Sequence, residues 1–219
     1  MTQLRPEPML RPAVRRWLAI AGISAPILFV VSAGVHSLAR DDHSLLRDPI
    51  SALAAGSSGW IQGMTFVIAG LLMIAFGLGL HLTLRPSRHV DPGPQLVAIF
   101  GLGMIGAALW PAVDASGVFT AARPAHVIAG FVTFTSAWLA AMALAPRLAR
   151  DPGWIGLSRY VGAAGVVLLL LFIAGSTLVR PASGPLHDWL GLFQWVYLGV
   201  WFTCVAVLAV RLLRRSPAG

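Results

Sequence analysis

Six long stretches without Asp, Glu, Lys or Arg constrain the fold of this chain more than any other feature of its sequence. Each approaches or reaches the roughly 20 apolar residues that a helix needs to cross the hydrocarbon core of a bilayer. Backbone groups find no water there, so these stretches must form helices. The sequence therefore predicts an all-α, polytopic transmembrane bundle of six helices. The helices cover residues 17–38, 60–82, 96–113, 125–144, 160–178 and 189–210.

Composition excludes an ordinary soluble domain. Apolar residues make up 57% of the chain, charged residues only 11%, and the mean hydropathy is +0.78. Soluble domains carry charge on roughly a quarter of their residues. The net charge of +8 does not indicate nucleic acid as a partner, because the basic residues lie at the margins of apolar stretches and form no exposed stripe. All of them are arginines, which favours a GC-rich bacterial genome. For a multi-spanning bacterial protein the expected location is the inner membrane.

Arginine positions predict the orientation of the bundle. One set of flanks holds Arg5, Arg11, Arg15, Arg16, Arg85, Arg88, Arg147, Arg150, Arg159, Arg211, Arg214 and Arg215. The other set holds only Arg40, Arg47, Arg123 and Arg180. Under the positive-inside rule the first set is cytoplasmic, and so are both chain ends. Residues 1–16 then form an N-tail, residues 17–213 the transmembrane domain and residues 214–219 a C-tail.

Two alternatives to this topology stay open. The third stretch is short and ends in Trp110-Pro111, and if it does not span, the orientation of everything after it inverts. The first stretch could instead belong to a cleaved secretory signal. Residues 15–18 are similar to a twin-arginine motif and residues 37–39 to a cleavage site, although five further spans favour a retained anchor.

The predicted orientation collects most of the acidic and histidine residues at the outer face. They are Asp41, Asp42, Asp48, Asp114 and Asp188, with His36, His43, His126 and His187. A polar functional site is therefore expected at this face. A cluster of His36, Asp114, His126 and His187 would supply ligands for a divalent metal, but no local signature such as H-E-x-x-H supports it. Structural hydrogen bonds are the alternative role of each histidine.

Two outer helix starts resemble each other. His126 and His187 each follow a proline by two residues, with a glycine four residues further on and a polar residue seven further on. The two sets are His126, Gly130 and Thr133, and His187, Gly191 and Gln194. Because positions i, i+4 and i+7 share one face of a helix, each helix is expected to present a stripe of hydrogen-bonding groups.

The first outer loop is too apolar in its second half to be an ordinary solvated loop. Asp48-Pro49 is typical of a helix start, so a short helix is expected from Pro49 to about Ala55. Asp48 would cap it, while Asp48, Ser51 and His126 are also the catalytic candidates. The four outer arginines either pair with local carboxylates, the favoured reading, or hold a lipid phosphate.

Several segments resemble one bacterial membrane family, catalogued as domain of unknown function 998. They are Arg47–Leu53 followed by Gly59-Trp60, Gly101–Gly106 leading to Trp110-Pro111 with Asp114, His126, and Gly191–Gln194. The resemblance covers nearly the whole chain and implies a multi-spanning membrane protein without an established activity. At greater distance the chain is similar to membrane hydrolases that gather His, Asp and Ser around a metal, although their paired-His motif is missing here.

Three function classes follow from these residues. The first is lipid binding at the outer face, or scaffolding of another membrane protein. The second is a metal-dependent hydrolase acting on lipids or amphiphiles, in which a metal-bound water would be the nucleophile. A transporter component is less favoured, because the spans have no ionisable residue at their centres.

Overall fold

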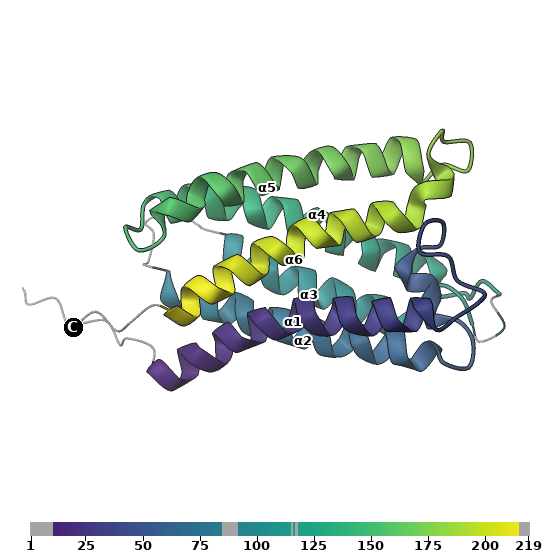
Figure 1. Cartoon of the computed structure of the whole chain (residues 1–219), viewed down its shortest axis with the longest axis horizontal. Helices are drawn as coiled ribbons and strands as arrows, with labels where there is room; N and C mark the ends of the chain where they lie inside the picture. Colours follow the sequence, from purple (N-terminus) through teal and green to yellow (C-terminus); the bar gives the residue numbers. More distant parts are fainter. Residues whose placement is uncertain (1–10, 85–91, 115, 117, 215–219) are drawn as a thin grey trace, which may run out of the picture.

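The computed structural model of this chain describes residues 11–84, 92–114, 116 and 118–214. Most of the predicted N-tail, the C-tail from residue 215, and Arg85 and Arg88 lie outside the described residues. Within the described ranges there are six α-helices: α1 Pro12–Leu38, α2 Gly59–Thr83, α3 Gly93–Leu109, α4 Arg123–Ala149, α5 Ile155–Ala174 and α6 Leu190–Arg214. The same ranges hold three short helical turns: η1 Ile50–Ala54, η2 Gly175–Val179 and η3 His187–Trp189. The predicted all-α bundle of six helices is confirmed (Figure 1).

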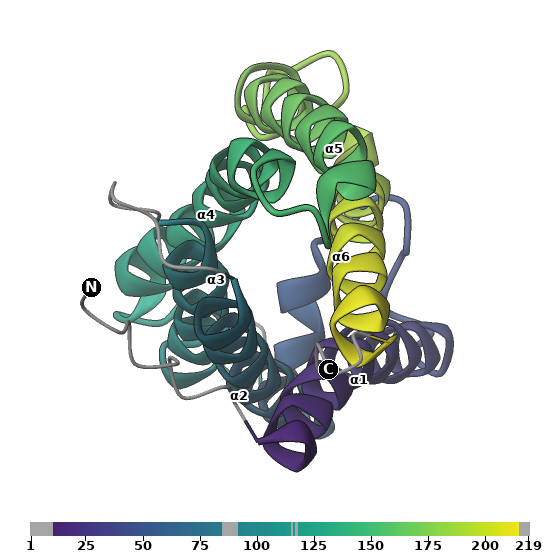
Figure 2. The ribbon, with the colours of Figure 1, turned by 90° about the vertical axis from the view of Figure 1, so that its left-hand side faces the viewer.

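The helices pack in chain order, and α6 returns to α1 to close a ring, as seen along the bundle in Figure 2. Consecutive helices run in opposite directions (Figure 1). One end of the bundle therefore carries the loops between α1 and α2, α3 and α4, and α5 and α6. The arginine pattern predicts that this end faces outward, and we call it the outer end.

Five of the helices are long and apolar enough to cross a membrane, so this is a multi-pass membrane protein. The exception is α3, with 17 residues and a length of about 25 Å. It begins earlier than the predicted residue 96 and ends at Leu109, short of the predicted residue 113. Pro111 explains the early end, because proline lacks an amide donor and disfavours helical geometry in the residue before it. Trp110 has left the helix, with φ −118° and ψ 77°.

Although α3 is the shortest of the six helices, it connects the two ends of the bundle. It lies between α2, which ends at the inner end, and α4, which starts at the outer end (Figure 1). An aromatic cluster joins this part of the ring to α1 and α6. Phe29 contacts Phe202 with ring centroids 5.2 Å apart, and Phe100 contacts Trp201 at 5.4 Å. These buried rings fix the walls on which the site is built.

Candidate functional site

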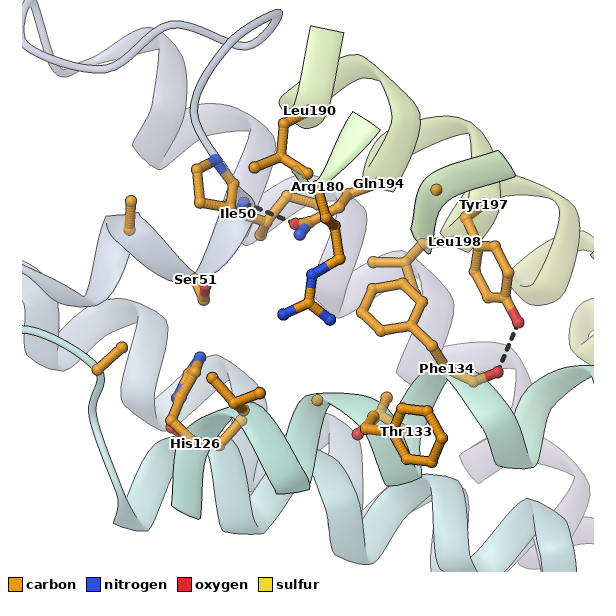
Figure 3. A pocket seen from close by; sticks show the side chains of 18 of the residues that line it. Ile50, Ser51, His126, Thr133, Phe134, Arg180, Leu190, Gln194, Tyr197 and Leu198 are labelled. Atoms are coloured by element: carbon orange, nitrogen blue, oxygen red, sulfur yellow. Dashed lines mark hydrogen bonds between the residues drawn. The ribbon is translucent and has the colours of Figure 1, made fainter. Parts of the chain in front are cut away.

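A cavity of about 480 Å³ lies inside the outer half of the ring. All six helices contribute to its lining, and α4 lies across the cavity from η1, η2 and α6 (Figure 3). Eight phenylalanines give the cavity a mostly apolar lining: Phe29, Phe66, Phe100, Phe119, Phe131, Phe134, Phe172 and Phe193. Its polar lining consists of Ser51, Arg123, His126, Thr133, Ser176, Arg180, His187, Gln194 and Tyr197. The combination is amphiphilic: the two arginines lie at helix ends, and every lining phenylalanine except Phe119 lies within a helix.

Both predicted stripes lead into this cavity. All three residues of the first stripe, His126, Gly130 and Thr133, line it from α4. From the second stripe, His187 and Gln194 line it, while Gly191 packs against the first outer loop. Two helices that start far apart in the sequence thus present their hydrogen-bonding groups to the same space.

Backbone carbonyls hold both histidines in one tautomer. Nδ1 of His126 lies 2.9 Å from the carbonyl oxygen of Trp110 and 3.1 Å from that of Ala107. Nδ1 of His187 lies 3.2 Å from the carbonyl oxygen of Val179. A carbonyl oxygen only accepts, so each Nδ1 carries the proton and donates it. In the neutral ring Nε2 is then left as an acceptor.

Arg180 reaches the cavity from the end of α5. The helix finishes in a π-type turn, η2, in which the amide of Arg180 donates to the carbonyl oxygen of Gly175 at 2.9 Å. Pro181 follows and has no amide donor with which to extend the turn. The guanidinium of Arg180 points into the cavity toward the wall that carries His126 and Thr133 (Figure 3).

Among the residues that the structure describes, the predicted ion pairing of the outer arginines is found for Arg40 and for no other. Arg40 pairs with Asp42 at 2.6 Å, and its hydrogen bonds hold the pKa of Asp42 below the ordinary value. Arg123 instead stacks on the ring of Phe119, 3.6 Å from its centroid. Among the described residues neither Arg123 nor Arg180 has a carboxylate partner, and none of the cavity-lining side chains is acidic. The sequence held an indication that Arg123 and Arg180 lack a local partner, since each of the two lies at least eight positions from any acidic residue.

The four predicted metal ligands are not brought together. His126 and His187 line the cavity, whereas His36 and Asp114 do not. His36 contacts the hydroxyl of Ser58 at 3.0 Å between α1 and α2. A carboxylate oxygen of Asp114 accepts from the amide of Val118 within its own loop. Across the described part of the chain, no three His, Cys, Asp or Glu side chains are grouped to hold a metal ion.

The three catalytic candidates are also divided. Ser51 and His126 line opposite walls of the cavity (Figure 3), and Asp48 is not part of the lining. The short helix predicted from Pro49 is present as η1, but Asp48 does not cap it. Its carboxylate turns back and accepts from the amide of Ser44 at 2.7 Å, because Pro49 stands at the cap position and extends the chain there.

The first outer loop is fastened over the cavity by α6. The amide of Ile50 donates to Oε1 of Gln194 at 3.0 Å (Figure 3), and the amide of Leu192 donates to the carbonyl oxygen of Leu46 at 3.1 Å. Arg40 donates to the carbonyl oxygen of Ala55 at 2.8 Å and so holds the far end of η1. Ser51 is thereby positioned as part of the cavity wall.

Residues 23–211 match a family described as a protein of unknown function, DUF998. The chain belongs to DUF998. No curated protein and no solved structure matches it. In this DUF998 protein, segments that carry the sequence resemblance meet in space: the loop that includes Ile50 docks on Gly191–Gln194, and His126 bonds the carbonyl oxygen of Trp110. Together they build the outer half of the cavity.

Tyr197 closes the inner side of the cavity and offers a small test of this geometry. Its hydroxyl donates to the carbonyl oxygen of Phe134 at 2.6 Å, linking α6 to α4. Tyr197→Phe is expected to lower the free energy of unfolding by about 1 kcal/mol, the usual net contribution of one hydrogen bond. Thermal unfolding in detergent measures the change. Tyr160→Phe is the matched control, and equal midpoints for the two variants would contradict the role of the α4–α6 bond.

Proposed function

We propose that this DUF998 protein binds one amphiphile, a lipid or one chain of a lipid, in the cavity of its outer half. A volume of about 480 Å³ falls in the size class of sites for single small molecules. The observation that supports this proposal is the lining of the cavity, in which eight phenylalanines adjoin arginine, histidine and amide side chains. This matches a molecule with an apolar chain and a polar head.

The setting supports a lipid over a water-soluble ligand. The cavity lies inside a ring of membrane helices, and the orientation predicted from the arginines would put it at the depth of the outer leaflet. Binding alone requires none of the convergent ligands that a metal-dependent hydrolase would need, and the described residues do not group such ligands.

Filling the cavity tests the proposal. Gly130 lines it, and a Cβ added there would meet no atom within 4 Å. Gly130→Leu is therefore expected to occupy the ligand's space without disturbing the fold. The protein is purified in a neutral detergent, and its bound lipids are extracted and counted by mass spectrometry. We expect about one lipid per wild-type chain and a loss of most of it in Gly130→Leu.

Gly199→Leu is the control for this experiment. Gly199 is exposed on α6, a Cβ there also meets no atom within 4 Å, and it does not line the cavity. The control should keep the wild-type lipid content. Equal lipid content in both leucine variants would show that copurified lipid lies on the outside of the bundle, and the proposal would fail.

A further inference from the structure

We infer that the cavity selects amphiphiles whose head group is an oxyanion, a phosphate or carboxylate with net negative charge. The inference rests on the proposed function and names the chemical class of its ligand. It is carried by the two arginines in the lining, Arg123 and Arg180, and by the lack of any acidic side chain among the described residues that line the cavity.

The two guanidiniums are available to a ligand. Neither Arg123 nor Arg180 has a side-chain hydrogen bond or ion pair with a described residue, and Arg180 points into the cavity (Figure 3). Stacking on Phe119 occupies the face of the Arg123 guanidinium. Its N–H groups lie in the plane of the fork, so they remain free to donate. Each fork can bind two oxygens of a phosphate or carboxylate at once.

The remaining polar lining complements an acidic head group. Oε1 of Gln194 already accepts from the amide of Ile50, which leaves the Gln194 amide NH₂ as a donor. Nε2 of His126 and of His187 is an acceptor in the neutral ring, because each Nδ1 donates to a carbonyl oxygen. A singly protonated phosphate has one O–H donor and several acceptor oxygens. Its O–H can donate to a histidine Nε2, and its oxygens can accept from the Gln194 NH₂.

Because the protein lies in a membrane, the head group and not the chain determines which lipid the cavity selects. A lipid chain gains little from leaving the bilayer for an apolar cavity, since lipid tails are as apolar as the lining. Discrimination must come from polar contacts. A neutral head would leave both guanidiniums unpaired, and a zwitterionic head would add a cation for which the lining has no carboxylate. A net anion satisfies both arginines.

The test compares two amphiphiles that share a chain and a phosphate. Wild-type protein in a neutral detergent is titrated with monododecyl phosphate or with dodecylphosphocholine, and bound adducts are counted by native mass spectrometry. Binding that Gly130→Leu removes is counted as binding in the cavity. We expect monododecyl phosphate to bind at least about tenfold more tightly, the factor for one charge-assisted contact. Inorganic phosphate at the same concentrations should not displace it.

Arg180→Gln removes one guanidinium and is expected to reduce the preference for monododecyl phosphate by about tenfold. Arg47→Gln removes an arginine that is exposed at the same end of the bundle but does not line the cavity, and it should leave the preference unchanged. Arg180→Lys keeps the charge without the planar fork, so its preference should fall between those of the wild type and Arg180→Gln. It also serves as the readout if the glutamine variant does not fold.

The outcomes separate the two proposals. Equal affinity for both amphiphiles, removed by Gly130→Leu, would overturn the oxyanion inference and leave amphiphile binding standing. Adducts that Gly130→Leu does not change would overturn both. Displacement of monododecyl phosphate by inorganic phosphate at similar concentration would assign the arginines to a free anion instead of a lipid head group. An unchanged preference in Arg180→Gln would remove Arg180 from the site.

Discussion

Gly101→Leu is expected to lower the free energy of unfolding by about 3 kcal/mol, the upper end of the cost of overpacking a close-packed interface. Here α2 and α3 touch through their backbones. A Cβ on Gly101 would overlap the carbonyl oxygen of Gly70, and a Cβ on Gly70 would lie 2.6 Å from the carbonyl oxygen of Gly101. Backbone atoms cannot rotate away as a side chain can, so the helices must separate. Close packing of small residues drives helix association in membranes, where the hydrophobic effect contributes little.

Thermal unfolding of the detergent-solubilised protein measures this effect, with circular dichroism as the signal. Gly199→Leu again supplies the control, because it adds the same side chain to a membrane helix without a clash. A midpoint for Gly101→Leu that equals the midpoint of the control would contradict the backbone contact between α2 and α3.

Gly191→Leu is expected to release the first outer loop from α6. A Cβ on Gly191 would overlap the carbonyl oxygen of Leu45 and lie 2.6 Å from that of Asp48. Displacing the loop breaks the bonds of Ile50 to Gln194 and of Leu192 to Leu46. Amide hydrogen exchange across residues 44–54 should rise at least about tenfold, since even one lost hydrogen bond corresponds to that factor.

The same variant should also lose bound amphiphile, because η1 carries Ser51 into the cavity wall. Hydrogen–deuterium exchange followed by mass spectrometry reports the loop, and lipid extraction reports the cavity. Gln194→Leu breaks only the bond to Ile50, so it should raise exchange by a smaller factor. Exchange at the wild-type rate in Gly191→Leu would mean that α6 does not hold the loop.

Parts of the site were predictable because they depend on spacing within a single helix. His126, Gly130 and Thr133 share one face of α4 by helical geometry alone, and all three line the cavity. The short helix after Pro49 followed from local turn chemistry. The prediction that Asp48 caps this helix was wrong. The carboxylate of Asp48 accepts from the amide of Ser44 instead, and η1 has no side-chain cap.

Distance along the chain separates Arg40 from Arg123 and Arg180, but it does not show that the last two meet at one site. Arg40 has Asp42 two residues away and pairs with it, whereas Arg123 and Arg180 come from opposite walls of one cavity. Nothing in the neighbourhood of Arg180 along the chain places it opposite His126. That arrangement depends on the π-type turn at the end of α5 and on the packing of α5 against α4.

The sequence by itself determined that this chain forms a bundle of membrane helices, because uncharged stretches of about 20 residues have no other way to satisfy their backbone in lipid. It also determined which residues share a face within each helix. Only the tertiary structure decided which faces meet. The rotation and closeness of the helices follow from contacts between distant glycines such as Gly70 and Gly101, and from the docking of Ile50 on Gln194. Those contacts bring two histidines and two arginines to the lining of one cavity: His126, His187, Arg123 and Arg180.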